Sequence, residues 1–247
     1  MAEKHYSEQI RHTQNYLIPY IQKYLSGSQI RRILEVGCAE GGGVKALQDA
    51  GFMGTGIDIE KYRIDMAREK NPGLDFRVMD ITDRQITEAL GHFDLIIMRD
   101  VIEHIPDRKA TFSVLRTLLR NNGYLYVTFP PRYSAFAGHQ QNGRSIMRRM
   151  PFVHVLPGIL IRGIGKLVNE NPDLVESFTE NFKVGLTIRA FEKHFQEHAF
   201  QPVVKELFLI RPVFKTRFNL TPRRLPPIPL FREFLALGCE CLLMKGD

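Results

Sequence analysis

The sequence predicts an α/β fold in which a mostly parallel sheet lies between two layers of helices. Three observations support this prediction: short apolar runs recur along residues 30–131, helical stretches separate them, and a glycine-rich turn follows the first run. Parallel strands are buried on both faces, and such strands have short, almost wholly apolar sequences. At 247 residues the chain is long enough for one α/β domain with additions and too short for two complete ones.

The first strand is expected over residues 33–36, and the glycine-rich turn after it is the most informative segment of the chain. Glycines let the main chain turn sharply and let a ligand approach the backbone without meeting a Cβ. Gly37, Ala39 and Gly42 fit a degenerate dinucleotide pattern, G-x-G-x-x-G/A. Glu35 favours a different ligand, because a carboxylate beside the turn disfavours a pyrophosphate and favours an ammonium group and hydroxyls.

The second and third strands are expected over residues 54–58 and 74–79, and each leads to an acid. Asp58 lies 23 residues after Glu35, the spacing at which a βαβ unit brings a carboxylate to a ribose edge. Asp58 also fits the N-cap of a helix expected over residues 62–70, and the two roles are compatible. Asp80 follows the third strand and is a second candidate for a ligand contact; alternatively, it is simply a turn residue.

The remaining strands are expected over residues 93–98, 123–129, 203–210 and 237–244, with a helix over 186–199. The fourth strand leads into Arg99, Asp100, Glu103 and His104. The ordered spacing of these strands is more specific than any single motif.

These residues together resemble the class I S-adenosylmethionine (SAM)-dependent methyltransferases. Their first motif, commonly Glu/Asp-x-Gly-x-Gly-x-Gly, is matched by Glu35, Gly37 and Gly41, with Ala39 in place of the middle glycine. The resemblance implies a Rossmann-like three-layer sandwich with a mostly parallel seven-stranded sheet. It also implies SAM as the cofactor and S-adenosylhomocysteine (SAH) as the product, with no metal.

The resemblance implies a role for each strand-end acid. In the family, the acid after the second strand holds both ribose hydroxyls, and the acid after the third strand and the next backbone N–H contact the adenine. The residues expected to bind SAM are Glu35, Gly37, Cys38, Ala39, Gly41, Asp58, Ile59, Asp80, Ile81 and Arg99.

Methyl transfer from a sulfonium needs alignment, exclusion of water and, for a hydroxyl acceptor, a base. The two candidate bases are His104, after the fourth strand, and His139, in a polar loop. An orienting role is the alternative for His104, and simple exposure is the alternative for His139. Asp100, Glu103 and His104 would share one helical face at i, i+3 and i+4, so a divalent-metal site is a further alternative.

The acceptor is expected to be a small molecule or a glycan or lipid carrier, methylated on a hydroxyl oxygen. Residues 1–131 hold 17 Lys and Arg against 17 Asp and Glu, whereas residues 132–247 hold 17 against 10. This excess favours an anionic or lipid-linked acceptor, although a solvated basic face explains it equally well. Nucleic acid is disfavoured, because the Asn/Asp-Pro-Pro-aromatic loop of nucleobase methyltransferases is missing after the fourth strand.

The domain organisation predicted is a single domain over residues 1–247. It comprises an N-terminal helical segment (1–29) with a break or kink at Pro19, a SAM-binding core (30–131), an inserted cover (132–185) and a C-terminal part (186–247) with a basic loop (211–233). Within the insertion, residues 144–166 are basic and apolar, and fit either a lid over the site or a peripheral membrane contact.

The three cysteines, Cys38, Cys239 and Cys241, suit a reduced compartment rather than a disulfide framework. The N-terminus lacks the apolar core of a signal peptide, and no apolar run has the length of a membrane span. A cytoplasmic location is therefore expected; the oligomeric state stays open. The alternatives to a methyltransferase are an NAD-linked oxidoreductase and a non-catalytic SAM-binding protein.

Overall fold

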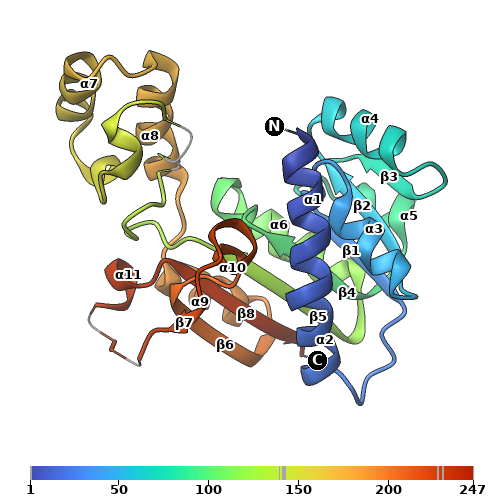
Figure 1. Ribbon diagram of the computed structural model, residues 1–247. Helices are drawn as coiled ribbons and strands as arrows, with labels where there is room; N and C mark the ends of the chain where they lie inside the picture. The colour runs from blue at the N-terminus through green and yellow to red at the C-terminus, as the bar shows by residue number, and fades with distance from the viewer. Residues whose placement is uncertain (1, 139, 141–142, 227, 230, 247) are drawn as a thin grey trace.

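The structure is a computed structural model that describes residues 2–138, 140, 143–226, 228–229 and 231–246. Within them, eight strands form one sheet in the order β3-β2-β1-β4-β5-β8-β6-β7 (Figure 1). The strands from β3 to β5 in this order are parallel, and β8 is antiparallel to both its neighbours. Their bounds are β1 Arg32–Val36, β2 Met53–Asp58, β3 Asp75–Val78, β4 Phe93–Arg99, β5 Leu119–Phe129, β6 Phe200–Ile210, β7 Arg223–Arg224 and β8 Gly238–Lys245.

The prediction of seven strands is wrong by one. The eighth strand, β7, lies inside the expected basic loop and pairs with β6 at the sheet edge. Two arginines have no apolar pattern, so their pairing was not visible in the sequence. The same segment also forms the short helix α10 Val213–Phe218, and α11 Arg232–Leu235 begins at its end.

Helices cover both faces of the sheet, because alternate strand residues point to opposite sides. Leu34 and Val36 of β1 join a core with α5 Ile86–Leu90, α6 Arg108–Leu118 and α9 Ile188–Glu197. Ile33 joins a second core with α2 Ile18–Tyr24 and α3 Gly42–Asp49 on the other face. Burying one such aliphatic side chain stabilises the fold by about 1.5 to 3 kcal/mol.

The N-terminal segment is helical throughout, but a π-helical turn over Thr13–Leu17 separates α1 Ala2–His12 from α2. Pro19 lies in the first turn of α2. Proline lacks an N–H and its ring clashes with the carbonyl four residues earlier, so the wider turn just before Pro19 relieves that clash. The predicted irregularity is therefore present, and it lies one turn earlier than Pro19 itself.

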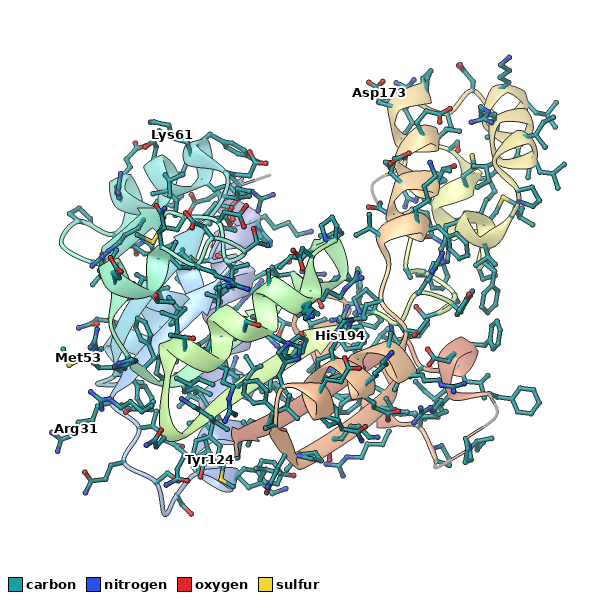
Figure 2. All side chains as sticks on the ribbon, turned by 180° about the vertical axis from the view of Figure 1, so that it is seen from behind. Arg31, Met53, Lys61, Tyr124, Asp173 and His194 are labelled. Carbon is teal, nitrogen blue, oxygen red and sulfur yellow. The ribbon has the colours of Figure 1, made fainter. Side chains whose placement is uncertain are left out.

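Within the insertion predicted over 132–185, helices form a compact projection after β5; from here on, the cover means its residues 143–185. It contains 3₁₀ turns over Ile146–Arg149 and Val153–Val155, α7 Gly158–Leu167 and α8 Pro172–Val184. In both views the cover stands away from the sheet, and Asp173 at the start of α8 marks its outer end (Figure 2). Helix α4 Lys61–Lys70 packs beside β3 at the opposite side of the molecule.

Candidate active site

A cavity of about 1740 Å³ opens where β1, β2 and β4 end. Pockets for a single small ligand have volumes of about 300–1000 Å³. Its walls come from the N-terminal helix, from these three strand ends, from α8 and from the chain around β6 and β8. The cavity is therefore large enough for two ligands lying side by side.

Glu35, the next-to-last residue of β1, lines this cavity and is almost fully buried. Its Oε1 accepts hydrogen bonds from Nε and Nη2 of Arg99, while Nη1 of Arg99 donates to Thr13 Oγ1 at 3.0 Å. The Oε2 atom of Glu35 is buried and has no hydrogen-bond partner among the described residues. An acceptor left unpaired in this way costs about 1–3 kcal/mol, so the geometry suits a ligand that brings a donor.

The turn after β1 depends on three residues with positive φ. Gly37, Ala39 and Gly41 have φ values of 72°, 47° and 80°. A Cβ on Gly37 would overlap Val101 Cγ2, so the turn approaches the loop after β4 too closely for any side chain. Ala39 has a Cβ in the left-handed region, which costs about 1–2 kcal/mol.

Asp58 orders this turn through its carboxylate. Oδ2 accepts from the backbone N–H of Ala39 at 2.9 Å, and Oδ1 accepts from the N–H of Glu60 at 2.9 Å. The N-cap of α4 is Glu60, with no side-chain cap, so Asp58 is not the capping residue that the sequence allowed. The next residue, Ile59, lines the cavity and is 63% exposed, so an apolar side chain stands open beside the acid.

Asp80 and Ile81 line the cavity at the end of β3. Asp80 Oδ1 accepts from the N–H and the hydroxyl of Thr82, both at 2.8 Å. Asp80 is exposed, whereas the side chain of Ile81 is buried. A carboxylate and an apolar side chain thus lie beside the open end of the cavity.

Most of the residues predicted to bind SAM line one cavity: Glu35, Gly37, Ala39, Asp58, Ile59, Asp80, Ile81 and Arg99. Cys38 and Gly41 do not line it. The Cys38 N–H donates to Ile57 O at 3.0 Å, and its thiol is buried against Gly56. Gly41 caps α3 against Phe76, so these two residues shape the turn from behind.

The other half of the cavity was not predicted residue by residue. Arg211, directly after β6, forms an ion pair with Asp100, and Phe208, Phe214 and Phe218 lie on the same wall. The position of Arg211 at a strand end was the only signal in the sequence. His12 of α1 also lines the cavity, and burial together with the Arg99 and Arg211 cations lowers its pKa to about 3.

His104 lines the same cavity. Its Nε2 lies 3.8 Å from Oε1 of Glu103. Partial burial lowers the pKa of His104, with Arg108 acting in the same direction and Asp100 opposing it. The imidazole is therefore neutral at pH 7 and able to accept a proton. The pKa of Glu103 is raised, first by its complete burial and then by Asp100.

The shared helical face expected for Asp100, Glu103 and His104 is absent. Asp100 has a φ of 56°, and the short 3₁₀ turn begins only at Ile102. Across the described ranges, no cluster of three or more His, Cys, Asp or Glu side chains is arranged to hold a metal ion. His139, the second predicted base, lies outside the described residues.

Glu240 of β8 is a further cavity residue that the sequence did not single out. Tyr16 donates its hydroxyl to Glu240 Oε1 at 2.7 Å, which joins the N-terminal helix to the sheet. Burial raises the pKa of this carboxyl to about 7, against the opposing effect of the Tyr16 hydrogen bond. In the sequence, the only sign of Glu240 was that it is a polar residue alternating with apolar ones in a predicted strand.

Comparisons with known proteins agree with this architecture. The profile of a family described as "Methyltransferase domain" matches residues 6–167. Two similar curated proteins are both named "Ubiquinone biosynthesis O-methyltransferase". The one from Bordetella avium is 29% identical over 44% of this chain and 46% of its own length, and the one from Histophilus somni is 30% identical over 54% and 60%. The chain spans about half the length of the curated relatives it matches.

Solved structures share the fold at low sequence identity. A plantazolicin methyltransferase in complex with SAH aligns with a TM-score of 0.62 at 12% identity, over 100% of this chain and 90% of that chain. Magnesium protoporphyrin IX methyltransferase from Synechocystis PCC 6803 with bound SAH aligns with a TM-score of 0.54 at 15% identity, over 96% and 85%. The family match covers well over half of the sequence and favours SAM over the NAD-linked alternative. The chain belongs to the methyltransferase domain family and has the fold of class I SAM-dependent methyltransferases.

Proposed function

We propose that the protein transfers a methyl group from SAM to a hydroxyl oxygen of a small, largely apolar acceptor. One observation carries the proposal: a single cavity presents three strand-end acids on one side and an aromatic, arginine-containing wall on the other. The first side fits the cofactor, and the second has room for the acceptor.

The cofactor half fits SAM group by group. The unpaired Oε2 of Glu35 suits the ammonium of the methionine end, and Arg99 beside it suits the carboxylate. Asp58 suits the ribose hydroxyls. Asp80 and the main chain of Ile81 suit the adenine, while Ile59 offers an apolar side chain to it. SAM supplies a methyl group activated by a positively charged sulfur.

The acceptor half favours an aromatic or apolar molecule. Phe214 and Phe218 pack edge to face with ring centroids 5.5 Å apart, and Phe208 lies on the same wall. The Asp100–Arg211 ion pair adds a polar group that can orient a hydroxyl. Relatives named as O-methyltransferases of ubiquinone biosynthesis support an oxygen atom as the acceptor. The cavity volume of about 1740 Å³ also leaves room for a glycan or lipid-linked acceptor with a hydroxyl group.

His104 is proposed as the base that removes the acceptor proton. It lies in the cavity, its side chain is 42% exposed, and its imidazole is neutral at pH 7. The carboxylate of the buried Glu103 lies 3.8 Å from its Nε2 atom. General-base catalysis of this kind contributes about 10²–10⁴-fold in rate.

The decisive experiment is calorimetric titration of the full chain with SAH and, as a control, NAD. Micromolar binding of SAH alone is expected, followed by transfer of labelled methyl from SAM to members of a panel of phenols. Binding of NAD alone would overturn the proposal at the cofactor. SAH binding without transfer to any phenol, sugar or polyprenyl hydroxyl would instead favour a non-catalytic SAM-binding protein.

A further inference from the structure

The cover folds around a core of its own. Its buried apolar residues pack with one another, and all belong to the cover: Met147, Val153, Ile161, Val175 and Phe178. Glu170 ties its start to α8, because its carboxylate accepts hydrogen bonds from the backbone of Arg144 and Ser145 and from the N–H of Asn171. Apolar side chains elsewhere on the cover are therefore not needed to hold it together.

Several large apolar side chains nevertheless lie on the outside of the cover. Leu167 is 88% exposed, Ile159 is 75% exposed and Leu160 is 52% exposed, all on α7. Leu160, Gly163 and Leu167 share one helical face at i, i+3 and i+7, and Ile159 lies beside it. Ile146, Phe152 and Leu156 are exposed in the segment that leads to α7. Exposed apolar groups gathered in this way mark an interaction surface.

The segment that carries this surface is basic along its own sequence. Residues 143–169 contain Arg144, Arg148, Arg149, Arg162 and Lys166, and no Asp or Glu. Arg162 lies 3.3 Å from Glu176 of α8. Within the part of the chain that the structure describes, Arg149 and Lys166 have no acidic side chain within 4.0 Å. The surface therefore combines exposed apolar side chains with unneutralised cations.

We propose that this face of the cover, with α7 at its centre, docks on an anionic lipid bilayer. The apolar side chains of α7 enter the boundary between headgroups and acyl chains, and the surrounding Arg and Lys bind lipid phosphates. Helix α7 has ten residues, about 15 Å in length, so it lies along the surface. Across the described residues, no helix is long and apolar enough to cross a membrane.

The charge pattern argues against a second copy of the chain as the occupant. A two-fold contact places the same patch on both sides, so the unneutralised Arg149 and Lys166 would meet cations of the same patch. A bilayer that contains acidic lipids presents the opposite charge and an apolar interior together, which matches both features of the surface.

Docking here would give the cover a role in delivering the acceptor, a consequence that rests on the proposed function. Leu174, Ser177 and Asn181 of α8 line the cavity, and so does Arg148. The cover thus contacts the cavity on one side and presents α7 on another. An apolar acceptor dissolved in the bilayer could then enter the cavity along the cover.

Tryptophan fluorescence offers a direct test, because the chain contains no Trp. Leu160→Trp places the only indole on the proposed face, and Met53→Trp places it on an exposed site of β2, 62% exposed. Figure 2 shows Met53 on the opposite side of the molecule from Asp173. With vesicles of phosphatidylcholine and about 30% phosphatidylglycerol, emission of Leu160→Trp should move to shorter wavelength and that of Met53→Trp should not.

Sedimentation with the same vesicles tests the energetics. The full chain should bind anionic vesicles, bind pure phosphatidylcholine weakly, and lose most binding at about 0.5 M NaCl. Ile159→Ser, Leu160→Ser and Leu167→Ser together should lower the partition coefficient at least about tenfold, and Met53→Ser should leave it unchanged. Arg149→Glu with Lys166→Glu should lower it on anionic vesicles only.

Three results would overturn the proposal: no binding to anionic vesicles, equal emission shifts at both Trp positions, or binding unaffected by the triple variant. Dimerisation in analytical ultracentrifugation that the triple variant abolishes would assign the face to a second copy instead. SAH titration of each variant keeps the two proposals separate. If the chain binds SAH but not vesicles, only the membrane-docking proposal is rejected. If it binds vesicles but not SAH, only the proposed methyltransferase activity is rejected.

Discussion

Arg99, at the end of β4, donates two hydrogen bonds to one oxygen of Glu35, at the end of β1, and the second oxygen of that carboxylate is buried without a partner among the described residues. The pair combines a satisfied ionic contact with an open acceptor. Because the two residues lie on neighbouring parallel strands, the sheet itself fixes their distance. The open oxygen is available for a cationic ligand group.

Glu35→Gln should weaken SAH binding about ten- to hundredfold, because a hydrogen bond to a charged group contributes about 1.5–3 kcal/mol. Calorimetry measures this change directly. The single variant also leaves Arg99 without its carboxylate, so Glu35→Gln combined with Arg99→Gln serves as the control. The double variant should regain thermal stability without regaining affinity. Unchanged affinity in the single variant would remove Glu35 from the cofactor site.

Asp58→Asn should weaken binding of adenosine-containing ligands at least about tenfold, because the amide offers one acceptor oxygen in place of two. Methylthioadenosine and its 2′-deoxy analogue allow a thermodynamic cycle. The wild-type chain should prefer the ligand with the 2′-hydroxyl, and Asp58→Asn should lose that preference. An equal loss for both ligands would assign Asp58 only to the turn that it orders through Ala39.

His104→Gln should lower kcat about a hundredfold or more at saturating SAM and leave SAH affinity within about twofold. Because the pKa of His104 is lowered from 6.5, the imidazole stays neutral at pH 7, and wild-type kcat should fall only in a more acidic range. The exposed His92, which contacts Thr117 O, provides the control substitution His92→Gln. Parallel losses of kcat and SAH affinity would indicate a structural role instead.

Glu240→Gln should change how stability depends on pH. The pKa of Glu240 is raised from 4.5 to about 7 in the folded protein, so the folded state binds this proton more tightly than the unfolded state. Its contribution is fully present below pH 4.5 and is lost as pH rises through about 7, an effect on the order of 1–3 kcal/mol. Urea unfolding across this range should show that decline in the wild type and a flatter profile in the variant. If the stability of the wild type and of Glu240→Gln changed with pH in parallel, the raised pKa of Glu240 would be contradicted.

Ala39→Gly should raise the free energy of unfolding by up to about 1 kcal/mol, since φ at this position is 47° and glycine adopts that conformation without a clash. The greater freedom of glycine in the unfolded chain limits the gain. Ala46→Gly, in the ordinary right-handed helix α3, is the matched control and should destabilise the protein. A loss of stability at Ala39 equal to that at Ala46 would show that the turn carries no strain.

Local patterns predicted most of the sheet, because each strand is a short apolar run next to a glycine or an acid. The first five predicted strands match β1 to β5 within a few residues at their N-terminal ends, and the last two match β6 and β8. The pattern missed β7, whose two arginines pair at an edge and bury nothing. It placed Asp100 on a helix because residue spacing cannot reveal a positive φ.

The half of the cavity that we propose for the cofactor brings together predicted residues for a topological reason. Parallel strands end at one edge of the sheet, so the acids at the ends of β1 and β2 and just after β3 must lie near one another there. The acceptor half has no such rule. Arg211, Glu240 and His12 reach the cavity from segments far apart in the chain, and only the packing of those segments brings them together.

The sequence by itself determined the family and the succession of strands along the chain, and it predicted the strand-end acids proposed for the cofactor, because these depend on local patterns and on the fixed geometry of parallel βαβ units. Only the tertiary structure decided that Arg99 occupies one oxygen of Glu35 and leaves the other open, and that Tyr16 joins Glu240. It also decided that the apolar residues of α7 lie outside the core of the cover. Contacts between distant segments depend on shape, burial and charge in three dimensions, which spacing along a chain does not encode.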